Sequence, residues 1–87
     1  MKITLKTLSG TVFDVEVEPD TAIGRVKDLV ASSEHGIAQG WDRPGEAELL
    51  KLLHKGNFLQ NETTDLASYR VQDGDFIVIM PPTKRGG

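Results

Sequence analysis

Met1-Lys-Ile-Thr-Leu-Lys-Thr-Leu-Ser-Gly10 alternates apolar and polar side chains and then reaches a Ser-Gly pair. An alternation with period two is typical of a strand that buries one face only. The Ser-Gly pair supplies the positive-φ position that a tight hairpin needs. Residues 11–18 alternate in the same way, with acidic residues on the face opposite the apolar ones. The sequence therefore predicts a β-hairpin with one apolar face, against which the rest of the chain packs.

Length and composition limit what this hairpin can belong to. The chain has 87 residues, 38% of them hydrophobic, so we expect one small domain that buries about 60–65% of its unfolded surface. It has no cysteine, which excludes disulfides and cysteine-based zinc sites. The formal net charge of −3 gives no general reason to bind nucleic acid. No apolar run approaches the roughly 20 residues of a membrane span, and Met1 leads directly into the strand, so we expect a soluble cytoplasmic or nuclear protein.

A helix follows the hairpin. Pro19-Asp20-Thr21 predicts a turn and a helix start, with Asp20 or Thr21 capping the first free amides. The helix is expected to end at 32–34, with His35-Gly36 as its exit turn. Its apolar stripe is predicted at Ile23, Val26, Leu29 and Val30. Its more polar faces are predicted at Arg25, Lys27 and Asp28.

Residues 36–48 have no regular period, because glycines and a proline interrupt them. We expect a loop of about a dozen residues, which is long for a compact domain. The only tryptophan, Trp41, lies in it. Its side chain either anchors the loop on the helix end or stays exposed as an interaction residue.

The second half of the chain predicts more strands. Apolar residues in 49–54, the Gly56 turn and Phe58-Leu59 indicate two short strands, and Phe76–Met80 is a continuous apolar run that suggests a central strand. The expected fold is α+β, a β-grasp with a mixed sheet of 4–5 strands and one main helix packed across it. Residues 1–80 would form this domain, and residues 81–87, which begin with Pro81-Pro82, a flexible tail or linker.

The residues themselves resemble the ubiquitin family. The similarity runs without a gap from Met1 to about Val30 and covers the chain end to end except for the enlarged 36–48 loop. Two segments, 3–8 and 76–80, are similar to the N-terminal ubiquitin-like domain of proteasome shuttle factors that also act as excision-repair escorts. The other residues that carry the family resemblance are Val15–Pro19, Ile23, Val26-Lys27, Gly56, Leu59, Leu66, Tyr69 and Arg85-Gly86-Gly87.

The resemblance implies a partner-binding patch. In the family, an apolar surface recognises short amphipathic helices, and its positions fall here on Leu8, Leu53, Val78 and Met80. Phe58 is expected beside this patch. The implied partners are proteasomal ubiquitin receptors or other proteins with ubiquitin-interacting helices, bound weakly, at about micromolar affinity or above. The expected basic rim of the patch consists of Lys6, Lys51, His54 and Lys55.

Simpler interpretations remain for these residues. Leu53 and Leu49 alternate with Leu50 and Leu52, and a shift of one residue would exchange the exposed and buried pairs. Met80 either belongs to the patch or closes the end of the core. The lysines of the rim are either partner contacts or ordinary solvated charges.

Nothing in the sequence predicts catalysis. The histidines, His35 and His54, have no cysteine and no suitably spaced carboxylates around them. We find no phosphate-binding loop and no nucleophile motif, so we expect a protein without enzymatic activity, cofactor or metal, and a monomer.

The end of the chain allows a second interpretation. In the conjugated members of the family, a flexible tail ending in Gly-Gly is activated and joined to lysines, and Gly86-Gly87 is similar to that ending. The alternative prediction is therefore a protein modifier linked through Gly87, whose partners would be activating and conjugating enzymes. Pro81-Pro82 departs from the family pattern, and only Lys6 and Lys27 match lysines that ubiquitin uses to build chains.

Overall fold

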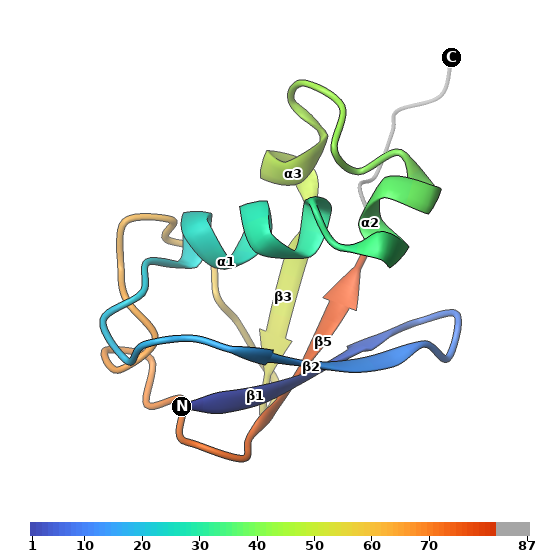
Figure 1. The fold of residues 1–87 in the computed structure, drawn as a ribbon. Helices are drawn as coiled ribbons and strands as arrows, with labels where there is room; N and C mark the ends of the chain where they lie inside the picture. The colour runs from blue at the N-terminus through green and yellow to red at the C-terminus, as the bar shows by residue number, and fades with distance from the viewer. Residues whose placement is uncertain (82–87) are drawn as a thin grey trace.

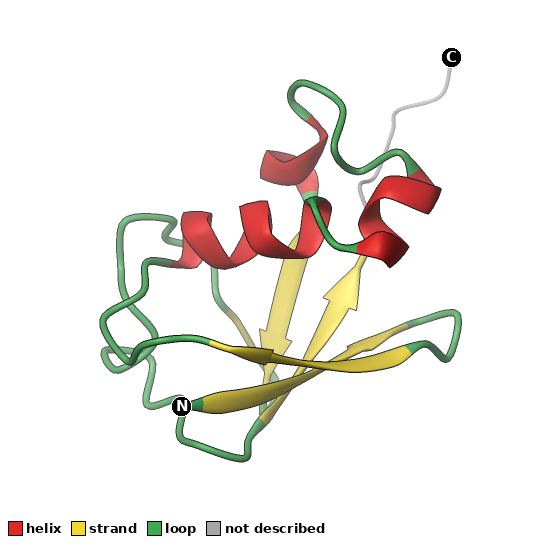
Figure 2. Ribbon diagram, viewed as in Figure 1, coloured by secondary structure: helices red, strands yellow, loops and turns green. Residues whose placement is uncertain are grey.

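The computed structural model describes residues 1–81, which form one sheet with helices on one side of it (Figures 1 and 2). The rest of the predicted tail lies outside the described residues. The strands are β1 (Lys2–Thr7), β2 (Val12–Glu16), β3 (Lys51–His54), β4 (Asn57–Phe58) and β5 (Phe76–Met80). The helices are α1 (Ile23–Ala31), α2 (Glu34–Gln39) and α3 (Glu46–Leu49).

The strand order is β2-β1-β5-β3-β4, with β1 and β5 parallel and the other neighbours antiparallel. The predicted hairpin and its register are confirmed, since Ile3 lies opposite Val15 and Leu5 opposite Phe13. The last strand is central, as predicted, because β5 pairs with both β1 and β3. The α+β, β-grasp architecture expected from the order of elements is therefore the observed one.

The core lies between the sheet and α1. The inward residues of β1, β3 and β5 meet the apolar stripe of α1 there, and most of them have no exposed surface. The largest fully buried side chains are Ile3, Leu5, Ile23, Val26, Val30, Leu50, Leu52, Leu59, Leu66, Ile77 and Ile79.

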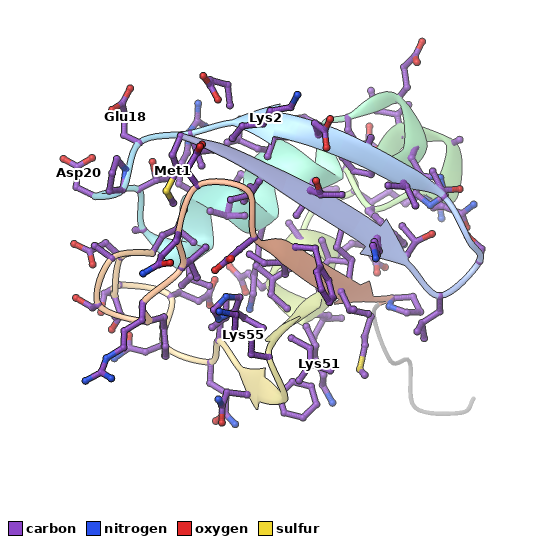
Figure 3. All side chains as sticks on the ribbon, turned by 90° about the horizontal axis from the view of Figure 1, so that it is seen from below. Met1, Lys2, Glu18, Asp20, Lys51 and Lys55 are labelled. Carbon is purple, nitrogen blue, oxygen red and sulfur yellow. The ribbon has the colours of Figure 1, made fainter. Side chains whose placement is uncertain are left out.

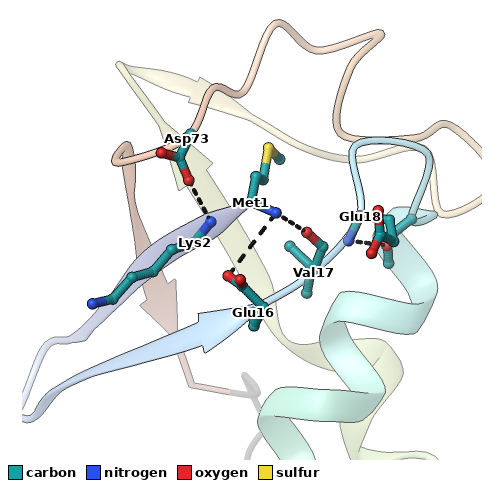
Figure 4. A network of polar contacts seen from close by, with 7 residues as sticks. Met1, Lys2, Glu16, Val17, Glu18 and Asp73 are labelled. Carbon is teal, nitrogen blue, oxygen red and sulfur yellow. Dashed lines mark hydrogen bonds and ion pairs between the residues drawn. The ribbon is translucent and has the colours of Figure 1, made fainter.

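Polar contacts hold the beginning of β1 in place (Figure 4). The α-amino group of Met1 donates to the carbonyl of Val17 at 2.7 Å, and the amide of Lys2 donates to Asp73 Oδ1 at 2.6 Å. The amide of Gly74 in turn donates to the carbonyl of Lys2 at 2.8 Å. The first bond closes the open end of the hairpin, and the two bonds of Lys2 join β1 to the turn before β5, beside which the two strands run parallel.

The prediction of a long irregular loop at 36–48 is wrong, because this part of the chain forms two short helices, α2 and α3. Ser33, predicted to lie in the end of α1, instead caps α2, and its Oγ accepts from the amide of Gly36 at 3.1 Å. Gly40 ends α2 in the left-handed conformation, at φ 80°. Trp41 follows and is 6% exposed, with its ring edge-on to His35, so the anchor interpretation is confirmed. Leu49, expected in a strand, ends α3.

The start of α1 also differs from the prediction. Neither Asp20 nor Thr21 caps it, because Ala22 is the N-cap residue and has no side-chain oxygen. The free amides of Ile23 and Gly24 donate instead to backbone carbonyls of the 62–64 loop, both at 2.9 Å. Lys27, predicted on a polar face, is only 6% exposed, because α3 packs against that side of α1.

Candidate functional site

One outward residue from each strand forms a row across the sheet, on the face away from the helices. Directly paired residues share a face of a sheet, and the pairing runs from strand to strand without a break. We call this side of the sheet the outward face. Its central row is Val12, Lys6, Val78, Leu53 and Phe58, in the order of the strands.

The row is apolar except at Lys6. Leu53 and Val78 are half-buried at its centre, whereas Phe58 is 43% exposed at the β4 edge. Leu50 and Leu52 are 1% exposed, so the predicted register of β3, with Leu53 outside, is confirmed.

Two further predicted patch residues lie on or next to the same face. Met80 is half-buried and pairs with Lys51, while its neighbour Ile79 is fully buried, so Met80 belongs to the outward side of β5 rather than to the core. Leu8 lies in the hairpin turn after β1 and is 66% exposed. The structure thus brings Leu53, Val78, Met80 and Phe58 together, with Leu8 at the end of the hairpin.

Lysines border this apolar surface. The ammonium of Lys6 lies 4.2 Å from the centre of the Phe76 ring, an attractive cation–π geometry. Lys51 and Lys55 are exposed and lie at the two ends of β3, as Figure 3 shows from this side of the sheet. The apolar residues of β3, β4 and β5 therefore have basic neighbours, Lys6 on β1 and Lys51 and Lys55 at the ends of β3, whereas β2 carries Asp14 and Glu16 on the same face.

Two exposed apolar residues of this face were not among the predicted patch residues. Phe76 is 46% exposed and shares the outward side of β5 with Val78 and Met80. Val12 is 57% exposed on β2. Alternation along each strand carried the signal for both, since each lies two residues from an outward neighbour.

His54 is not part of the rim, and that expectation is wrong. Because side chains alternate along β3, His54 lies on the other face of the strand from Leu53, and its side chain points inward and is only 4% exposed. Its Nε2 lies 2.9 Å from Asp75 Oδ2, which also accepts from the amide of Gln72 at 3.0 Å. The hydrogen bond from the Gln72 amide has the largest effect on the pKa of Asp75, and the one with His54 adds to it. Together with the positive charge of Lys55, they hold this pKa below its ordinary value of 3.8. His54 thus fastens β3 to the turn before β5.

The remaining predicted features concern chemistry and the tail. Within residues 1–81, no cluster of three histidine or carboxylate side chains is arranged to hold a metal ion. In the same part of the chain, no helix is long and apolar enough to cross a membrane. Gly86 and Gly87, the conjugation residues of the alternative interpretation, lie outside the described residues.

Comparison with known proteins agrees with this geometry. The profile of the ubiquitin family matches residues 3–81. The chain is 30% identical over 80 residues to the UV excision repair protein RAD23 homolog of Dictyostelium discoideum, covering 92% of this chain and 20% of that protein. It is 32% identical over 80 residues to the probable ubiquitin receptor RAD23 of Oryza sativa subsp. japonica, covering 92% and 19%.

A solved structure is similar over the whole chain. Caldiarchaeum subterraneum ubiquitin superposes with a TM-score of 0.74 at 27% identity, and the match covers 99% of this chain and 98% of that one. The curated relatives are much longer, since the chain spans about a fifth of their length. The similarity predicted from the sequence is therefore confirmed in both family and fold.

Proposed function

This chain belongs to the ubiquitin family, and we propose that it is an interaction domain that docks a larger protein on the proteasome or on other receptors with ubiquitin-binding helices. The observation that carries this proposal is the outward face, where an apolar row is bordered by lysines. Two of the similar proteins are named for UV excision repair and as a ubiquitin receptor, and each is about five times as long as this chain. The proposal implies that the protein acts in the cytoplasm and the nucleus.

The shape of the outward face favours a helix as the partner. An α-helix is about 10 Å wide, and neighbouring strands lie about 4.8 Å apart, so one helix covers about two strands. Its apolar stripe would lie on Leu53 and Val78, which are paired across β3 and β5. Acidic residues at its edges would lie near Lys6 and Lys51, which are exposed on β1 and β3, the two strands that flank β5. Such an interface is small, below about 1,200 Å², and would be transient.

The test is an NMR titration of the protein with a synthetic ubiquitin-interacting helix that has an apolar stripe and acidic flanks. We expect shifts on the outward face, and at least a tenfold loss of affinity for Leu53→Asp with the fold retained, because a buried carboxylate at the centre of the contact has no partner. Ile37→Asp is the matched control, since Ile37 is 55% exposed on α2, on the helical side. Shifts confined to the helical side would refute the proposal.

The second candidate is a modifier joined to lysines through Gly87, which the sequence Arg85-Gly86-Gly87 favours. The burial of Lys27 argues against ubiquitin-like chain building at that position. Immunoblots of denatured cell extracts, with an antibody to this domain, separate the two functions. A ladder of conjugates that disappears when Gly87 is mutated would establish the modifier. One discrete band far above 9.5 kDa, resistant to deconjugating proteases, would establish an embedded docking domain.

A further inference from the structure

Lys27 is a buried cation without a counter-charge in the described structure. Its side chain is 6% exposed, and its Nζ donates to the backbone carbonyl of Glu48 at 3.5 Å, the outer limit of a hydrogen bond. Among residues 1–81, no carboxylate oxygen lies within 4.0 Å of this ammonium. Lysines are rarely this buried unless they are paired. The position therefore favours a negative charge supplied from outside the domain.

Lys27 is one of the residues that line a groove of about 500 Å³ beside the β3–β4 edge, as is Glu48, whose carbonyl accepts from its ammonium. Leu49 of α3 and Phe58 of β4, which are 46% and 43% exposed, give the groove apolar walls that solvent reaches. Lys27 and Lys51 line it together with one carboxylate residue, Glu48, so its lining is positive on balance. The other lining residues are Leu50, Leu52, Leu59 and Gln60.

We propose that this groove binds an acidic side chain carried on an apolar peptide segment of a partner protein. The ammonium of Lys27 takes the carboxylate, and Leu49 and Phe58 contact the apolar residues on either side of it. Because the groove is largely apolar, the Coulomb attraction between the two charges is stronger there than in open solvent, which offsets part of the desolvation cost of the incoming carboxylate. A glutamine in place of the acid would leave the ammonium unpaired, so the groove discriminates acid from amide.

Phe58 connects the groove to the outward face, because it ends the central row and also lines the groove. The choice of a protein segment as the occupant rests on the proposed function, since a helix seated on the row reaches the groove at Phe58. The charge complementarity of the groove does not depend on that function.

The experiment titrates isotope-labelled protein with the peptide Ac-Leu-Glu-Leu-NH₂ and with its amide twin, Ac-Leu-Gln-Leu-NH₂. The signals to follow are the Cε–Hε group of Lys27 and the amides of 48–52 and 58–60. We expect saturable shifts with the acidic peptide and binding at least fivefold weaker with the amide. Lys27→Met keeps an unbranched side chain up to Cε, removes the ammonium, and should abolish the discrimination. Lys55→Met, at an exposed lysine that does not line the groove, should preserve it.

The fold provides an independent readout. Because the charge of Lys27 has no carboxylate partner among residues 1–81, Lys27→Met should unfold in urea at the same concentration as the parent protein or a higher one. If the unfolding equilibrium constant of Lys27→Met were ten times larger than that of the parent protein, the proposal would be overturned, because the charge of Lys27 would then stabilise the fold itself.

Two other outcomes separate this proposal from the proposed function. Equal shifts with both peptides, or none with either, would refute the groove site and leave the helix titration of the outward face unaffected. Leu53→Asp should leave tripeptide binding unchanged, and its loss in that variant would also refute the groove, because the peptide would then lie on the row. Failure of the helix titration alone would refute only the docking function.

Discussion

The outward face of the sheet and the segment 32–50 determine the exposure of their side chains in different ways. On the face, exposure follows the pleat of the strands, so Leu53 is outside because Leu52 is inside. In the segment, burial depends on single anchors. Trp41 is 6% exposed, whereas Ile37, four residues earlier, is 55% exposed. A change on the outward face should therefore alter binding, and a change at an anchor of the segment should alter stability.

The largest stability effect is expected at Trp41. Trp41→Ala removes a large side chain that packs in the core cluster, and should lower the free energy of unfolding by about 3–5 kcal/mol. Urea denaturation followed by circular dichroism measures this loss. Phe76→Ala is the control on the outward face, since Phe76 is 46% exposed, and should cost less than about 1 kcal/mol. Equal losses for the two variants would remove the distinction between the regions.

Gly36 tests whether tight packing holds α2 in place. A Cβ at this position would lie 2.3 Å from the carbonyl oxygen of Val30 and 2.4 Å from that of Ala31. We expect Gly36→Ala to destabilise the fold by about 2 kcal/mol through this overlap. Helix propensity alone would stabilise the variant by about 1 kcal/mol, so the sign of the change in the thermal midpoint decides. A higher midpoint would mean that α2 moves away from α1 without cost.

The smallest effect concerns the polar contacts of the sheet. Because the pKa of Asp75 is below its ordinary value, its charged form stabilises the fold above about pH 4, and this contribution is lost as the pH falls through the lowered pKa. Asp75→Asn should cost about 1–2 kcal/mol at pH 7, and less as the pH approaches the lowered value. Urea unfolding at pH 7, 4 and 3 measures the difference. A constant difference over this range would contradict the role of the charge.

The sequence predicted the strands better than the segment between them. Alternation in 1–18 placed Ile3 and Leu5 inside, and the same reasoning along β3 and β5 would have excluded His54 from the rim and added Phe76 to the face. The helices α2 and α3 had no such signal, since each is shorter than two full turns and depends on local caps such as Ser33 and Gly40.

Local backbone geometry can be read from the chain, because the pleat of a strand imposes a period of two wherever one face is buried. That is why the β-hairpin could be predicted from the residues alone. The register of β3, with Leu53 outside, was instead predicted from the family resemblance, and the central place of β5 from its continuous apolar run. The positions of Lys27, Trp41 and His54 depended on distant parts of the chain. The ammonium of Lys27 donates to the carbonyl of Glu48, and the imidazole of His54 lies in hydrogen-bonding contact with Asp75. Trp41 lies beside residues of α2 and of the sheet. Only tertiary packing decided these positions, because burial depends on which groups the fold brings together.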